Sequence, residues 1–139
     1  MTIQTIATLK TNMPSGVPGG TTVQDMHDLV DTLEERTTQE IVAKTASYTA
    51  TAADNRRFFT MNSASANTFT VPDVAPIGWE CAVMQIGAGQ TTIAVGGTGA
   101  LRHRESHTKI AGQYAIIYLK VYANAGTAPQ VAFTGETAL

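Results

Sequence analysis

From residue 43 onward, apolar and polar residues alternate in short runs that turn-forming residues separate. Alternation with a period of two is typical of β-strands with one buried face. It predicts strands at residues 46–52, 57–62, 67–72, 80–87, 91–96, 114–123 and 130–135, and a less regular one at 100–110. Strands that recur about every ten residues predict an all-β domain, a β-sandwich or jelly roll.

The stretch SYTATAADNRRFF (residues 47–59) interrupts this alternation with Ala53, Asp54 and Asn55. Asp and Asn favour turns because their side chains bond the backbone two residues on. We interpret the break as a hairpin corner, not a binding or catalytic site. The glycine-rich stretches at 87–89 and 96–99 are also interpreted as hairpin turns, because no helix follows to make a phosphate site.

A different pattern precedes the strands. Residues 21–42 predict one amphipathic helix, whose apolar residues recur at steps of three and four, with a threonine at 21 or 22 as its N-cap. These apolar residues form one stripe along the helix, and the stripe packs either on the chain's own β domain or on the same helix of other copies. We name as candidate oligomer contacts Val23, Met26, Val30 and Leu33.

Residues 1–20 combine a weakly alternating stretch, 1–13, with the Gly- and Pro-rich linker PSGVPGG. Such an extension is typical of an arm that adds to a neighbour's sheet, and disorder at the terminus is the alternative. The candidate anchor residues are Ile3, Ile6, Leu9 and Met13. The expected organisation is therefore an arm (1–20), a helix (21–42) and a β domain (43–139).

Charge is scarce, at 14% of residues against about 25% in a typical soluble domain. A chain with so little charge is expected to bury surface by self-association. The net charge of −2 argues against a nucleic-acid partner, and no window is apolar enough to predict a membrane span. Acidic residues concentrate before residue 42, as a solvated helix face or an electrostatic docking surface.

Candidate chemistry is sparse. His103 and His107 would lie roughly 13 Å apart along a strand, too far to share a metal ion. With Arg102, Arg104 and Lys109 they make a basic loop or edge strand. It is either a plain polar surface or a contact for an acidic partner or glycan. Neither the carboxylates nor the serines show a glycosidase or nucleophile-elbow pattern. We therefore predict no catalytic residue, no metal site and no cofactor.

The lone cysteine, Cys81, excludes an intrachain disulfide and is expected to be a buried thiol. Among the aromatic residues, Trp79 follows a Pro-Ile-Gly turn and is the best candidate for an exposed sugar contact, although structural packing is the favoured interpretation. Tyr114, Tyr118 and Tyr122 share one parity, which predicts a common strand face in the core or an interface.

Three segments, YTATAADNRRFFTMNSASANTFTVP, MQIGAGQTTIAVGG and AGQYAIIYLKVYAN…QVAFTGE, resemble a β domain of tailed-bacteriophage virion proteins. That domain occurs in head fibres, capsid decoration proteins and the ends of tail fibres. The resemblance spans residues 46–136, and the helical lead-in before residue 42 is similar too. It implies trimeric, non-enzymatic β modules on a virion surface. The chain departs from the pattern at Arg56-Arg57 and in RHRESH, so no partner-specific role carries over to those residues.

We therefore expect a virion protein, made in the host cytoplasm, of the capsid decoration or head-fibre type. At 139 residues there is room for an anchor on the major capsid protein but not for a long fibre shaft. The alternative is a tail-fibre or receptor-binding module that contacts host glycan through Trp79, Arg102, His103, Arg104 and His107. A small hydrolase would need converging carboxylates, or a serine and a histidine, which the sequence gives no reason to expect.

Overall fold

A computed structural model describes residues 38–139, which are mainly β. The predicted arm and nearly all of the predicted helix lie outside the described residues, and with them the candidate anchor and oligomer contacts Ile3, Ile6, Leu9, Met13, Val23, Met26, Val30 and Leu33. Within the described part, no helix is long and apolar enough to cross a membrane.

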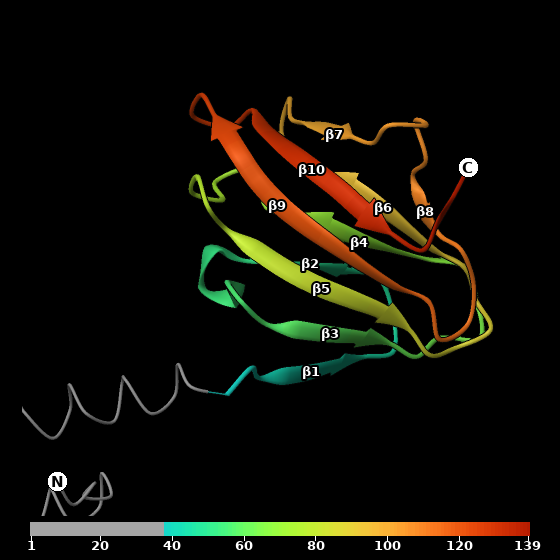
Figure 1. Cartoon of the computed structure of the whole chain (residues 1–139). Coiled ribbons are helices and arrows are strands. Elements are labelled where there is room, and N and C mark those ends of the chain that lie inside the picture. The colour runs from blue at the N-terminus through green and yellow to red at the C-terminus, as the bar shows by residue number, and fades with distance from the viewer. Residues whose placement is uncertain (1–37) are drawn as a thin grey trace, which may run out of the picture. The chain divides into compact units, whose positions relative to one another are not determined.

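Two mixed sheets form the β domain (Figure 1). The first sheet has the order β1 (Ile41–Lys44), β3 (Phe58–Met61), β5 (Glu80–Gln85), β9 (Ile116–Asn124), β10 (Pro129–Gly135) and β7 (Ala100–Arg102). The second has the order β11 (Thr137–Ala138), β8 (Lys109–Ile110), β6 (Thr91–Val95), β4 (Asn67–Val71) and β2 (Tyr48–Thr49). A short 3-10 turn, η1 (Ala52–Asp54), follows β2.

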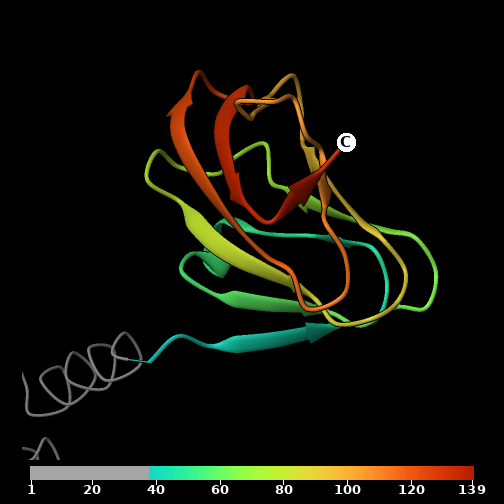
Figure 2. The same ribbon diagram turned by 45° about the vertical axis from the view of Figure 1, so that its right-hand side comes forward.

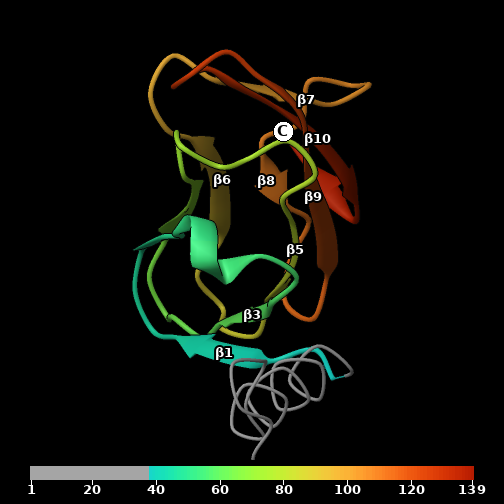
Figure 3. The same ribbon diagram turned by 90° about the vertical axis from the view of Figure 1, so that its left-hand side faces the viewer.

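Successive strands from β1 to β6 alternate between the two sheets. As a result β1, β3 and β5 run parallel in one sheet, and β2, β4 and β6 run parallel in the other. The chain thus crosses repeatedly between two sheets, which face each other in Figure 2. The edge strands of the first sheet are β1 and β7, as Figure 3 shows. A jelly roll is built from antiparallel strands, so that part of the prediction is wrong.

This winding also corrects the predicted hairpins. The break at Asp54 and the glycine-rich turn at 96–99 each carry the chain from one sheet to the other. In residues 38–139 the consecutive strands that pair with each other are β9 and β10. Turn-forming residues indicate where a strand ends, but they do not tell whether the next strand pairs with it, because both connections need the same turn chemistry.

Two predicted boundaries also change. Residues 41 and 42, placed in the helix, belong to β1, where β-branched Ile41 and Val42 pair with β3, so the β domain begins before residue 43. The irregular strand at 100–110 divides into β7 and β8, which lie in different sheets.

The core lies between the sheets, where the inward residues of both meet. Phe59 of β3 and Phe69 of β4 are fully buried, with ring centroids 4.9 Å apart. On β9 the buried Ile117, Leu119 and Val121 alternate with exposed positions, as a strand with one buried face requires.

Gly89 lies against the backbone of residues 63–65, which leaves no room for a side chain. A Cβ built on Gly89 would lie 2.0 Å from the Ser65 carbonyl oxygen, whereas one on Gly112 would meet nothing within 4 Å. We expect Gly89→Ala to lower the free energy of unfolding by about 2 kcal/mol through overpacking. Gly112→Ala, with no positive φ to strain, is the control and should change it by less than about 0.5 kcal/mol. Equal urea midpoints for the two variants would contradict this account.

Candidate functional site

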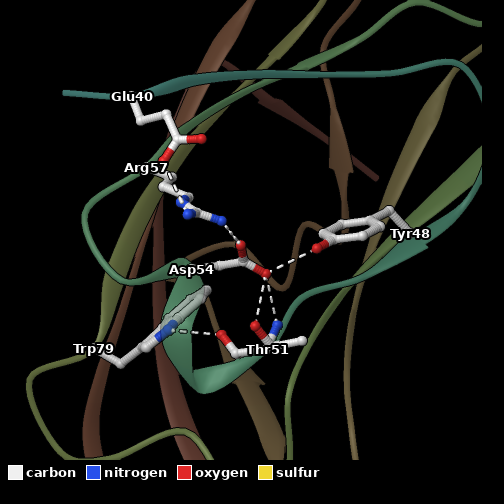
Figure 4. Close-up of polar contacts among 6 residues, drawn as sticks. All are labelled: Glu40, Tyr48, Thr51, Asp54, Arg57 and Trp79. Carbon is white, nitrogen blue, oxygen red and sulfur yellow. Dashed lines mark hydrogen bonds and ion pairs between the residues drawn. The ribbon is translucent and has the colours of Figure 1, made fainter.

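The sequence singles out two regions, the break at Asp54 and the ligand surface that combines Trp79 with residues 102–107. The structure assigns Trp79 to the first region instead of the second. Its side chain is 1% exposed, and its indole Nε1 donates to the Thr51 carbonyl oxygen at 3.2 Å (Figure 4).

The structural packing of Trp79 is therefore confirmed, and its candidate place in the ligand surface is wrong. Gly78 has a φ of 91° and its N–H donates to the carbonyl of Val121 at 2.8 Å, which ties the turn to β9. Ile77, at the tip of that turn, is 67% exposed, while the following tryptophan joins the buried core. The turn residues alone do not reveal which of them points inward.

Asp54 is the centre of a buried polar cluster, with 2% of its surface exposed. Its Oδ2 accepts hydrogen bonds from the Tyr48 hydroxyl at 2.8 Å and from the Thr51 N–H at 2.8 Å, while Arg57 donates to Oδ1 (Figure 4). Arg57 also pairs with Glu40 at 2.9 Å. Because Tyr48 belongs to the second sheet and Arg57 immediately precedes a strand of the first, the carboxylate joins the two sheets.

The charge of Asp54 is stabilised by these donors. Burial alone would raise the pKa of the carboxyl, but the hydrogen bonds from Thr51, Tyr48 and Arg57 outweigh it, so the pKa lies below its usual value. Both oxygens are occupied by donors of the chain itself. The arrangement serves to hold the crossing between sheets.

Residues 102–107 remain exposed or half-buried, and all of them except Glu105 line a surface pocket of about 480 Å³. Its walls include the side chains that the sequence grouped together, namely Arg102, His103, Arg104 and His107. Arg102 is partly engaged, since its Nε donates to Gln130 at 2.9 Å. The pocket therefore offers guanidinium groups that suit a carboxylate, sulfate or phosphate group.

The two histidines lie much closer together than a strand would allow. Their rings stack with centroids 4.8 Å apart and an interplanar angle of 9°, so the expected separation along a strand is wrong. The cause is the loop between β7 and β8, in which Ser106 adopts a φ of 58° and turns the chain back on itself.

Hydrogen bonds determine which nitrogen of His103 carries the proton. Its Nδ1 accepts from the backbone N–H of Glu105 at 3.0 Å and of His107 at 3.4 Å. The proton of the neutral ring is then on Nε2, which donates to the Thr137 hydroxyl at 3.0 Å, and that hydroxyl lies 2.8 Å from His107 Nδ1. Thr137 is thus a member of this cluster that sequence reasoning missed, because it lies 30 residues or more along the chain.

Neither ring nitrogen of His103 is free to bind a metal ion. Across residues 38–139, no three or more His, Cys, Asp or Glu side chains gather in a way that could hold one.

Cys81 is buried, as the sequence predicts. Burial, with smaller contributions from the charges of Asp54 and Glu80, raises the pKa of its thiol. Because the thiolate is the reactive form, we expect native protein to resist a thiol-specific reagent at mildly alkaline pH, and denatured protein to react at one thiol per chain. Rapid labelling of the native chain would contradict this burial.

The predicted tyrosine face is corrected in part. Tyr118 and Tyr122 do share one face of β9, but it is the outward one, where they are 56% and 52% exposed. Tyr114 precedes the strand, with a φ of 68°. These tyrosines are therefore not core residues, and the interface interpretation remains a prediction.

Comparison of the chain with models of protein families, with curated proteins and with solved structures finds no match.

Proposed function

We propose that the chain is a non-enzymatic structural subunit of a bacteriophage virion, of the capsid decoration or head-fibre type. In this proposal residues 1–20 anchor it to the major capsid protein, and the two-sheet β domain, a sandwich in general form, projects outward. It assembles as a homotrimer, with Val23, Met26, Val30 and Leu33 among the contacts. The resemblance of residues 46–136 and the low content of charge support this proposal.

The observation that carries the proposal is a group of large apolar side chains that the β domain leaves exposed on one sheet. Ile41 is 71% exposed, Tyr118 56% and Tyr122 52%, all on strands of the first sheet. Large exposed apolar patches on a domain mark sites of association with other proteins. Burial of the subunit in an assembly accounts for both the exposed apolar side chains and the low content of charged residues.

Capsid binding by the full chain and by a chain that lacks residues 1–20 tests the proposal. We expect both to have the mass of a trimer in solution, and only the full chain to sediment with empty capsids. If the shortened chain binds capsids equally well, the anchor assignment is wrong. If neither binds, the decoration role fails.

The second candidate is a receptor-binding module of a tail fibre, and the pocket beside Arg102 and Arg104 favours it. Its guanidinium groups suit an acidic host glycan that bears carboxylate or sulfate groups. A glycan screen with the full chain and with Arg104→Ala separates the two roles. Loss of binding to acidic glycans in the variant supports the receptor role, and no binding by either chain contradicts it.

A further inference from the structure

The two sheets of the β domain present outer faces of different chemistry. Outward positions of the second sheet are mostly threonine, with two alanines and one lysine: Thr49, Thr68, Thr70, Thr92, Ala94, Lys109 and Ala138. An antiparallel or mixed sheet with one solvated face has polar residues outward. The second sheet follows this rule apart from its two alanines, whereas four neighbouring strands of the first sheet carry a group of mainly apolar residues outward.

Strand register brings uncharged side chains together on the outer face of the first sheet. One row across β1, β3, β5 and β9 consists of Ile41, Phe58, Ala82 and Tyr118, and the next row consists of Ala43, Thr60, Met84 and Ile116. We call these eight residues the outer panel. Four neighbouring strands (Figure 1) therefore carry a continuous surface without a charge.

Ala82 shows that this panel is closely packed. It points away from the core, yet it is only 2% exposed. Its register partners on either side are Phe58 and Tyr118, whose large side chains flank it. The low exposure of Ala82 follows from these two large neighbours, which cover it from both sides.

Charges of both signs border the panel on one side. Glu80 pairs with Lys120 at 3.1 Å and with Arg56 at 3.7 Å. A contact between the same patch of two copies differs from the one that closes a trimer, because a three-fold axis joins two different patches. A two-fold axis places the same patch of each partner face to face, so an isologous contact must be self-complementary. The uncharged panel meets this condition. Its border carries both acidic and basic side chains, so the acidic groups of one copy can pair with the basic groups of the other.

The size of the panel sets the strength of the contact. Strands about 4.8 Å apart and rows about 7 Å apart give an area of roughly 300 Å², against about 800 Å² per partner in a standard interface. A contact centred on the panel therefore extends over its border and Tyr122, and by itself it holds two isolated copies with modest affinity.

We propose that the outer face of the first sheet, centred on the outer panel, is the surface through which one copy of the chain packs on a second copy. This inference deepens the proposed role as a virion subunit and rests on it only for the setting in which the copies meet. It locates a contact on the β domain, in addition to those expected for the helix.

Sedimentation of the full chain over a wide range of concentrations tests the inference. Tyr118→Glu puts a charge in the centre of the panel and should raise the dissociation constant of self-association about tenfold or more, the penalty of an unpaired charge in an interface. Thr92→Glu, an outward mid-strand residue of the second sheet, is the matched control and should leave it unchanged. Ile41→Lys, at an edge strand where lysine is well tolerated, is the second variant in case Tyr118→Glu unfolds.

Self-association as strong as that of the unmodified chain in both panel variants would overturn the inference, as would an unmodified chain that stays a monomer, or stays at the mass of a trimer, at every concentration. A monomer whose capsid binding is lost in Tyr118→Glu would assign the panel to the capsid protein and also overturn it. Failure of all chains to bind capsids, with self-association lost only in the panel variants, would support the inference and contradict the capsid role.

Discussion

Asp54→Asn is expected to lower the free energy of unfolding by about 3 kcal/mol, because it leaves buried donors without the carboxylate they surround. The Tyr48 hydroxyl and Arg57 both donate to that carboxylate, which is 2% exposed. Urea unfolding of both chains at neutral pH measures the difference. Asp73→Asn is the control, since that side chain is only half-buried, and we expect a change below about 0.5 kcal/mol.

The effect of Asp54→Asn on the free energy of unfolding is also expected to depend on pH. The pKa of Asp54 is lower in the folded chain than its usual value, so this carboxylate stabilises the fold at every pH above its unfolded pKa of about 3.9. That contribution is lost as the pH falls through the lower, folded pKa. The gap between the unmodified chain and Asp54→Asn should therefore narrow below about pH 4. A gap that stays constant or widens in acid would show that Asp54 does not act through its charge.

Phe59→Ala is expected to lower the free energy of unfolding by about 3–5 kcal/mol, the usual cost of removing a buried phenylalanine from a core. The Phe59 ring is fully buried and lies 4.9 Å from that of Phe69 and 5.6 Å from that of Tyr48, measured between centroids. Its loss leaves a cavity where the two sheets meet. Urea or thermal unfolding measures the effect.

Phe58→Ala is the matched control, because it removes the same side chain one residue earlier on the same strand. Phe58 points outward and is half-buried, so we expect a loss of about 1 kcal/mol or less. If Phe58→Ala destabilises the chain as much as Phe59→Ala, the assignment of the two faces of β3 is wrong. The control has a second use, since a variant that keeps its stability but self-associates less supports the proposed contact at the outer panel.

Most strands could be predicted from the sequence because alternation reflects the environment of each residue along its own strand. Residues 116–124 show this, since Ile117, Leu119 and Val121 are apolar and buried while Tyr118 and Lys120 are exposed. The buried thiol of Cys81 follows from its apolar neighbours in the same way. Alternation says nothing about the partner strand, because parallel and antiparallel neighbours need the same pattern of inward and outward residues.

The candidate sites also combine features that neighbouring residues predict with features that depend on distant segments. The grouping of Arg102, His103, Arg104 and His107 could be predicted because these residues lie within six positions of one another, and they do line one pocket. The stacking of the histidines could not, since it depends on a left-handed Ser106 and on Thr137 from the end of the chain. The direction of the Trp79 side chain could not be predicted either, because a turn that is hydrogen-bonded to β9 decides which way it points.

Residues that are close in the chain, or the number of residues of one type, are enough to predict the β class of residues 43–139, the positions of most strands and the absence of an intrachain disulfide. Three features become visible only in the folded domain: the strands wind between two sheets, Asp54 joins these sheets, and an uncharged panel faces outward from one of them. These features depend on which distant segments pair, and pairing is determined by the packing of the whole domain.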